Sequence, residues 1–292
     1  MKLPNVKRRT EILGRRVRAV GEWRRLARLR SEGGDLGRLA RGLLWGRNPD
    51  PTAAENHRFH AIEARRWELL ASDQQVTFVD FGAISPDANL SESEMMQGST
   101  RTIPLAQVAR ASKPQSAAMF LYGVVREFAP RTVIEMGTCV GISGSYILAA
   151  MRAAGSDGNL VTMEGGESVA KIADETFHGL GFDGVEIVVG RHQDTLGTVL
   201  AAHSPVQFAF VDGDHGEGTT LSYHDRIVDA AADRAVIFHD DIRWSAGMTR
   251  MWDRLCNSER AVRAVVDLYG VGVCLVDKHH VGKPELFRLY MD

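Results

Sequence analysis

The sequence is poor in cysteine and has no long apolar run. It holds three cysteines, Cys139, Cys256 and Cys274, and no Cys-x-x-Cys pair. This pattern favours a reducing compartment and argues against a disulfide framework or a zinc knuckle. The apolar runs around residues 132–136 and 208–211 stop well short of the roughly 18 residues that a membrane span needs. We therefore expect a protein that does not cross a bilayer.

The N-terminal residues also lack the apolar stretch, ending in small residues, that marks a secretory signal. The expected location is the cytoplasm. With 44% hydrophobic and 25% charged residues, the composition is that of an ordinary globular protein. A chain of 292 residues can bury one large α/β core and a smaller accessory region.

The net charge of −2 conceals a basic N-terminal segment, because residues 1–47 carry about ten net positive charges. Apolar residues recur there at helical spacing among arginines, which predicts a basic amphipathic helix. These residues are Leu13, Val17, Val20, Trp23 and Leu26. The helix could rest on an anionic membrane surface, and nucleic acid is not the expected partner. The favoured interpretation is that its apolar stripe packs on the body of the protein or on a partner subunit in a homo-oligomer.

The pattern along the chain divides it into three parts. Residues 1–50 are the basic arm, and a run of glycines over 33–46 followed by prolines predicts a break at its end. Residues 51–130 are expected to form a mainly helical cap, interrupted by an extended piece at 76–81 and by a polar, serine-rich stretch at 83–103. A stretch of that kind is typical of a lid or a binding loop.

Residues 131–292 alternate between strands and helices. This alternation predicts an α/β fold with a Rossmann-like, mostly parallel sheet covered on both faces. The last two predicted strands, 261–267 and 271–276, are separated by only three residues, which indicates an antiparallel hairpin. Seven strands are expected in total.

The first chemical motif is the strand-turn-helix element 135–143. Gly137 and Gly141 allow a tight turn and close approach of a ligand to the main chain, at the end of a parallel strand where α/β sheets bind ligands. The dinucleotide pattern Gly-x-Gly-x-x-Gly does not fit here, which weakens an NAD hypothesis. Glu164 ends the next strand, where an acidic side chain can accept hydrogen bonds from ribose hydroxyls. Together these residues favour an adenosine ligand over the alternative that Glu164 is merely a solvated strand-end carboxylate.

Five segments occur in an order that resembles class I S-adenosylmethionine-dependent methyltransferases. They are 135–143, 162–167, 188–190, 211–215 and 239–245. The chain is most similar to the bacterial branch of macrocin-type and cephamycin-type O-methyltransferases, with catechol O-methyltransferase a more distant relative. The resemblance covers about residues 130–277 and implies S-adenosylmethionine as the cofactor.

The resemblance also implies which residues bind that cofactor. Gly137, Thr138, Gly141 and Ser143 would surround its methionine end, Glu164 would hold the ribose, and Arg191 or His192 would lie near the adenine. Glu135, Gly165 and Asp212 complete the predicted cofactor-binding set.

The acceptor side is predicted from acidic residues at two strand ends. Asp212 follows the fourth predicted strand of the core and Asp240 and Asp241 follow the fifth, so their carboxylates should converge on one rim. Oxygen ligands of this kind suit Mg²⁺, and we predict these three aspartates as a metal triad. The catechol-type relatives carry asparagine at the third position. The alternative role for Asp240 and Asp241 is to cap the following helix.

His215 is the predicted general base, with Asp212 as its catalytic partner. An imidazole titrates near neutral pH, and macrocin-type relatives are thought to use a histidine here, where catechol enzymes use lysine. His239 is expected to support the same motif. Trp244 and Trp252 are either walls of the acceptor pocket or packed aromatics, and Met95, Met96 and Tyr122 are weaker candidates from the cap region.

These observations predict an S-adenosylmethionine-dependent O-methyltransferase, assisted by a divalent cation such as magnesium. The expected acceptor is a hydroxyl of a small molecule such as a natural product, sugar or lipid-like compound. Three alternatives stay open: a metal-independent enzyme, a nitrogen-directed enzyme, and a non-catalytic binding protein on the same fold. The nitrogen-directed alternative is weakened because the Asn/Asp-Pro-Pro-aromatic tetrapeptide is replaced by 212–215.

Overall fold

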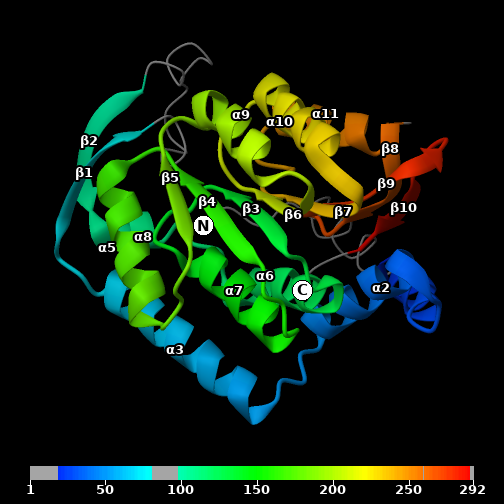
Figure 1. Ribbon diagram of the computed structural model, residues 1–292, viewed down its shortest axis with the longest axis horizontal. Helices are drawn as coiled ribbons and strands as arrows, with labels where there is room; N and C mark the ends of the chain where they lie inside the picture. Colours follow the sequence, from blue (N-terminus) through cyan, green and yellow to red (C-terminus); the bar gives the residue numbers. More distant parts are fainter. Residues whose placement is uncertain (1–18, 81–97, 259, 290–292) are drawn as a thin grey trace, which may run out of the picture.

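The centre of the molecule is an eight-stranded sheet. A computed structural model describes residues 19–80, 98–258 and 260–289 (Figure 1). The strand order is β10-β8-β9-β7-β6-β3-β4-β5, and neighbours are parallel except beside β9, which is antiparallel to both β7 and β8. The strands are β3 (Thr132–Met136), β4 (Asn159–Glu164), β5 (Glu186–Val189), β6 (Val206–Val211), β7 (Ala231–His239), β8 (Arg260–Asp267), β9 (Gly272–Val281) and β10 (Glu285–Arg288).

The predicted α/β class with a mostly parallel sheet is confirmed, but the predicted count of seven strands was wrong. The additional strand is β10, which runs parallel to β8 at the edge of the sheet. It is only four residues long, so its hydrophobic pattern was too short to distinguish it from a loop. The hairpin of β8 and β9 is therefore an internal part of the sheet rather than its end.

Helices cover both faces of the sheet, and each face has its own apolar core. On one side α2, α6, α7 and α8 contribute to the core, and on the other α9, α10 and α11 do so. Adjacent residues of β3 illustrate the alternation, since Val133 belongs to the first core and Ile134 to the second. The helices are α2 (Gly34–Arg47), α3 (Ala53–Leu70), α5 (Leu105–Ala109), α6 (Gln115–Phe128), α7 (Ile142–Ala153), α8 (Glu167–Gly179), α9 (His192–His203), α10 (Glu217–Ala230) and α11 (Ala246–Leu255).

Residues 48–52, after the glycine-rich segment, are neither helix nor strand, and the glycine-rich segment itself forms helix α2. Its glycines lie against α6: a Cβ added at Gly42 would come 2.7 Å from the Cα of Val124, and one added at Gly123 would come 2.3 Å from the carbonyl oxygen of Gly42. The two helices therefore approach so closely that larger residues would not fit. Tertiary packing outweighs the low helix propensity of glycine here.

The basic segment is helical over residues 19–29, and its apolar side packs on the body of the protein. Trp23 is 4% and Leu26 1% exposed, and the Trp23 ring lies 6.3 Å from that of Phe120. Arg25 forms an ion pair of 2.6 Å with Glu285 in β10. The described part of this helix is thus tied to the far end of the sheet. Leu13 and Val17 lie outside the described residues.

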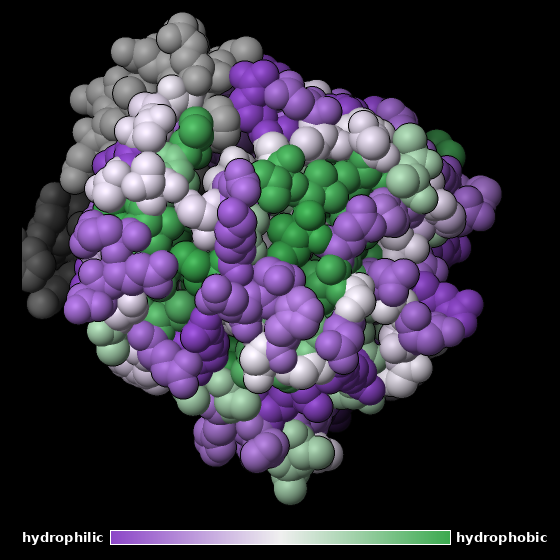
Figure 2. All heavy atoms as spheres, turned by 60° about the vertical axis from the view of Figure 1, so that its left-hand side comes forward, coloured by the Kyte–Doolittle hydropathy of each residue, from purple (hydrophilic) through white to green (hydrophobic). Residues whose placement is uncertain are grey.

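A separate two-stranded sheet stands beside the main one. Strands β1 (Gln75–Asp80) and β2 (Ser99–Pro104) pair antiparallel, and α5 follows directly. Phe78 of β1 packs over Gly166, close to the end of β4. Figure 2 shows the side of the molecule that carries this hairpin, where hydrophobic residues are visible between hydrophilic ones. Within the described chain, no helix combines the length and the apolar character needed to span a membrane.

Candidate active site

A cavity of about 500 Å³ opens at the carboxyl ends of β3, β4 and β6, with the β1–β2 hairpin and α5 forming a further wall. Eight of the predicted site residues line it: Gly137, Glu164, Gly165, Arg191, His192, Asp212, His215 and Asp241. Residues separated by about a hundred positions in the sequence thus share one cavity. The remaining predicted residues, Glu135, Thr138, Gly141, Ser143 and Asp240, lie behind its wall.

Glu135 is the centre of a buried hydrogen-bond network below the glycine turn. Its carboxylate accepts hydrogen bonds from the hydroxyls of Ser143 (2.6 Å) and Thr162 (2.7 Å), and Thr138 lies 2.6 Å from the Thr162 hydroxyl. Burial raises the pKa of Glu135 to about 7. These side chains hold the turn rather than line the cavity. Thr162 begins one of the five segments that carry the family resemblance, but no role was predicted for its side chain.

Two glycines fix the shape of the turn itself. Gly137 has a φ of 97°, and a Cβ there would come 2.2 Å from the carbonyl oxygen of Asp212. Gly141 has a φ of 85° and is the N-cap of α7. Only glycine adopts both conformations without strain, so the backbones of the β3 and β6 loops can touch.

Glu164 stands between the loops that follow β3 and β4. One carboxylate oxygen accepts a hydrogen bond from the backbone N–H of Cys139 and the other from that of Gly166, each at 2.9 Å. Burial raises the pKa of Glu164 to about 6. Each oxygen retains acceptor capacity toward the cavity, because a carboxylate has about four acceptor sites. The arrangement suits two hydroxyl donors of a ligand.

His192 lies flat over the loop after β6. A Cβ on Gly213 would come 2.2 Å from Cε1 of the His192 ring, and the Nε2 of His192 is 3.2 Å from the carbonyl oxygen of Met163. Burial lowers the pKa of His192, so the ring is neutral near pH 7. The neighbouring Arg191 donates from Nε to Asp194 at 2.6 Å. The cavity wall therefore includes an imidazole and a guanidinium from the segment that follows β5.

Asp212, His215 and Asp241 form a second group of polar residues on the cavity wall. Each of the three offers one ligand atom, and these atoms lie within 4.8 Å of one another. Nε2 of His215 is 3.7 Å from Oδ2 of Asp241. Burial raises the pKa of Asp212 to about 7, while the ammonium of Lys113 acts in the opposite direction.

Asp240 does not join this group, although it is adjacent to Asp241 in the sequence. Its side chain is 3% exposed and contacts the ammonium of Lys113, whose Nζ also lies 3.6 Å from Oδ2 of Asp212. The predicted triad of aspartates is thus divided by a lysine. Lys113 was missed because it precedes α6, far from every motif that the sequence analysis singled out.

The positions of the aspartates, His215 and Lys113 determine where a divalent cation could bind. A cation on Asp212, His215 and Asp241 would have two carboxylates and one imidazole, which is a workable donor set. A cation held by all three predicted aspartates does not fit, because the Lys113 ammonium lies between Asp212 and Asp240.

Three non-glycine residues that line the cavity have left-handed backbone conformations. They are Cys139 (φ 49°), Asp214 (φ 63°) and Asp241 (φ 51°). Such conformations are uncommon outside glycine and cost free energy, and they cluster at functional sites. At Asp241 the turn directs the carboxylate toward His215 while Asp240 points into the protein.

The aromatic candidates separate clearly. Trp244 lines the cavity and its ring lies 5.5 Å from that of His215, whereas Trp252 is fully buried and donates a hydrogen bond to Asp267. Tyr122 is buried as well and donates to Glu55 at 2.6 Å. Of these three only Trp244 can contact a ligand in the cavity. Met95 and Met96 lie outside the described residues.

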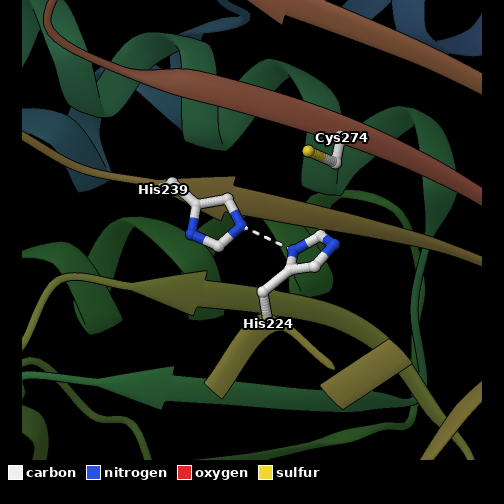
Figure 3. Close-up of side chains that lie close together, drawn as sticks. All are labelled: His224, His239 and Cys274. Atoms are coloured by element: carbon white, nitrogen blue, oxygen red, sulfur yellow. Dashed lines mark hydrogen bonds between the residues drawn. The ribbon is translucent and has the colours of Figure 1, made fainter. Parts of the chain in front are cut away.

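A second cluster of metal-ligating side chains lies behind β7. Figure 3 shows the imidazoles of His224 and His239 facing each other, with the Cys274 thiol to one side. The two rings share a hydrogen bond of 3.0 Å, and burial lowers the pKa of each, so the pair is neutral. Cys274 is fully buried, and burial raises the pKa of its thiol. Neutral groups in this position are core packing behind the loop that carries Asp240.

The family model of a methyltransferase domain matches residues 134–242. Among curated proteins, one from Mycobacterium sp. (strain JLS) that is assigned as an O-methyltransferase is 36% identical over 86 residues. That match spans 29% of this chain and 37% of the mycobacterial protein, so it covers little more than a third of the relative's length.

Two solved structures share the overall fold. Cofactor-bound Rv0187 from MTB matches with a TM-score of 0.52 at 20% identity, covering 81% of this chain and 95% of that one. The O-methyltransferase from Bacillus cereus in complex with SAH matches with a TM-score of 0.52 at 17% identity, covering 80% and 96%. The family match includes the glycine turn, Glu164 and both acidic strand ends. The segment that matches the methyltransferase model, residues 134–242, lies at the centre of the fold and contributes most of the residues that line the cavity.

Proposed function

We propose that this protein is an S-adenosylmethionine-dependent O-methyltransferase that acts on a hydroxyl of a small molecule, such as a natural product, sugar or lipid-like compound. One observation carries the proposal. A single cavity has the Glu164 carboxylate at one place on its wall and the His215 imidazole at another. The first suits the ribose of a nucleoside and the second suits deprotonation of an acceptor.

The cofactor would lie across the ends of β3, β4 and β6. Glu164 would accept hydrogen bonds from the ribose hydroxyls, and Gly165 would allow the sugar to approach the backbone. Arg191 and His192 would hold the adenine, and Gly137 would make room for the methionine end. Glu135, Thr138, Gly141 and Ser143 act indirectly, by holding the turn over which the methionine end passes.

The transfer is an in-line displacement at the methyl carbon, so the acceptor oxygen must approach opposite the sulfur. The acceptor hydroxyl gives its proton to the neutral imidazole of His215 as the oxygen–carbon bond forms. The carbon–sulfur bond breaks and its electron pair stays on the sulfur, which loses its positive charge. The Asp241 carboxylate, 3.7 Å from Nε2 of His215, stabilises the imidazolium that results.

A metal-assisted version of the same reaction is the second candidate. It is favoured by the proximity of ligand atoms on Asp212, His215 and Asp241. A divalent cation bound there would supply a Lewis acid for the acceptor oxygen. Turnover that survives exhaustive treatment with EDTA would argue against this version, and turnover restored only by added Mg²⁺ would argue for it.

Titration with S-adenosylhomocysteine in a calorimeter tests the main proposal. We expect saturable binding of one molecule per chain, with the affinity reduced in Glu164→Ala. Glu167→Gln is the matched control, because this carboxylate is 73% exposed and pairs with Lys171 on the same helix. Absence of binding at hundreds of micromolar would contradict the proposal and would favour a binding protein with another ligand.

A further inference from the structure

We propose that the ammonium of Lys113 is the resident cation between Asp212 and Asp240, where a divalent metal would otherwise bind. The inference deepens the proposed function and rests on it. It predicts that methyl transfer by this chain proceeds without a metal on those two carboxylates.

The backbone brings Lys113 to this place from outside the matched domain. Lys113 precedes Pro114, the N-cap residue of α6, which has extended backbone angles. The lysine side chain then crosses to the ends of β6 and β7 and is only 14% exposed. A lysine on the surface would be mostly solvated, so this degree of burial indicates a specific role for the charge.

The ammonium has two carboxylate partners. Nζ lies 3.6 Å from Oδ2 of Asp212 and contacts Oδ2 of Asp240, and the Asp212 side chain is 16% exposed. Within the part of the chain that the structure describes, Oδ2 of Asp240 makes no hydrogen bond of regular geometry. The ammonium of Lys113 is the positive charge that contacts this oxygen. A buried carboxylate without a cation is strongly destabilised.

The charges of the site therefore form two groups. Lys113 compensates Asp212 and Asp240, and Asp241 faces His215. The left-handed conformation of Asp241 produces this division, because it separates the directions of two successive side chains. A divalent cation bound to Asp212 and Asp240 would have to displace the ammonium from the same oxygens.

The ammonium of Lys113 could also stabilise the acceptor oxygen during the reaction. The acceptor hydroxyl develops negative charge as it loses its proton, and a fixed positive charge in a water-poor cavity stabilises it. Lys113 lines the cavity together with His215. The lysine thus supplies the charge stabilisation that a metal supplies in related chemistry, but it is covalently attached and cannot be removed by chelation.

Binding of Mn²⁺, followed by electron paramagnetic resonance, tests this assignment without relying on turnover. We compare the wild type with Lys113→Met, which keeps the length but removes the charge, and with Lys113→Arg, which keeps the charge. Lys171→Met is the control, because Lys171 is 71% exposed on α8. We expect Lys113→Met to bind one Mn²⁺ at least about tenfold more tightly than the wild type, and Lys113→Arg and Lys171→Met to bind no more tightly.

A further substitution shows where the gained ion binds. Adding Asp240→Asn to Lys113→Met should abolish the gained Mn²⁺ site, because it removes one of the two released carboxylates. Equal Mn²⁺ affinity of the wild type and Lys113→Met would overturn the inference, as would tight Mn²⁺ binding to the wild type that is lost with Asp240→Asn.

Binding of S-adenosylhomocysteine is measured for each variant in parallel. Retained binding shows that the variants are folded and that the proposed function stands even if the lysine assignment fails. A wild type that does not bind S-adenosylhomocysteine would contradict the proposed function. The Mn²⁺ measurement would then still decide whether Lys113 occupies the place of a metal. With turnover, we expect Lys113→Arg to recover part of the activity that Lys113→Met loses.

Discussion

Nε2 of His215 lies 3.7 Å from Oδ2 of Asp241, although the two residues follow different strands of the sheet. His215 comes from the loop after β6 and Asp241 from the loop after β7, which is its parallel neighbour. The register pairs Val211 with His239, so both loops leave the sheet at the same level. The pairing of His215 with Asp241 is therefore a consequence of sheet register.

Replacing His215 tests the role of this pair. We expect His215→Asn to lower turnover by about 10²- to 10⁴-fold, the usual contribution of a general base, with binding of S-adenosylhomocysteine unchanged. Asp241→Asn should cause a smaller loss, because the imidazole remains. Asp225→Asn serves as a control, since that carboxylate is 55% exposed and pairs with Arg260. Unchanged turnover in His215→Asn would remove this residue from the mechanism.

Glu164 should dominate the affinity for the nucleoside. Glu164→Ala removes two charged acceptor oxygens, and hydrogen bonds to charged groups are each worth about 1.5–3 kcal/mol, so we expect affinity for S-adenosylhomocysteine to fall by about 10²- to 10⁴-fold. The affinity of Glu164→Gln should lie between those of the wild type and Glu164→Ala, because its single amide oxygen can replace only one of the two oxygens that accept from Cys139 and Gly166. Calorimetric titration measures the series, and equal affinities would show that the ribose lies elsewhere.

The contact between Gly213 and His192 predicts a rescue experiment. The Cβ of Gly213→Ala would overlap the imidazole, with Cε1 only 2.2 Å away, and would push the ring out of place. We expect weaker binding of S-adenosylhomocysteine in Gly213→Ala and partial recovery in Gly213→Ala combined with His192→Ala. A double variant that binds no better than Gly213→Ala would show that the glycine is needed for another reason.

Glu55 should make the free energy of unfolding depend on pH. Burial opposes ionisation of its carboxyl, but hydrogen bonds from Tyr122, Thr52 and Arg126 together lower its pKa from 4.5 to about 2. The folded form then binds fewer protons than the unfolded form in this range, so stability is present above pH 4.5 and is lost as the pH falls toward 2. Urea midpoints of Glu55→Gln should depend less steeply on pH over that window than those of the wild type.

The control for this measurement is Glu68→Gln, on the same helix as Glu55. Its carboxylate is 66% exposed and pairs with Arg65 one turn away. Exposed pairs of this type contribute little to stability. An identical acid dependence of the wild type and Glu55→Gln would show that the hydrogen bonds to Glu55 have no net effect.

The parallel sheet and its rim were predictable because long, buried strands alternate with helices from β3 to β7. The turn at Gly137 and the acid at Glu164 follow from that pattern, since both lie at strand ends. Helix α2 was not predictable from local composition, because the fit of Gly42 against α6 is a long-range property. The short strand β10 depends in the same way on β8 being beside it.

The separation of Asp240 from Asp212 and Asp241 could not be predicted from the sequence for a different reason. Sequence spacing correctly brings Asp212 and Asp241 to one rim, but it says nothing of backbone angles. The φ of 51° at Asp241 separates this residue from Asp240, and the lysine that occupies the gap comes from a segment about a hundred residues earlier in the chain. Which charges pair in the interior depends on the folded structure, and the spacing of residues in the sequence does not reveal it.

The left-handed residues Cys139, Asp214 and Asp241 have a consequence for protein engineering. Glycine at any of them would remove a backbone penalty, so a screen for heat resistance should select Cys139→Gly or Asp214→Gly readily. Both residues line the cavity, and Asp214 also lies 3.4 Å from the hydroxyl of Tyr223. Variants selected for thermal stability alone would therefore gain flexibility in the loops that line the cavity. A useful screen must select for the proposed methyl transfer as well as for stability.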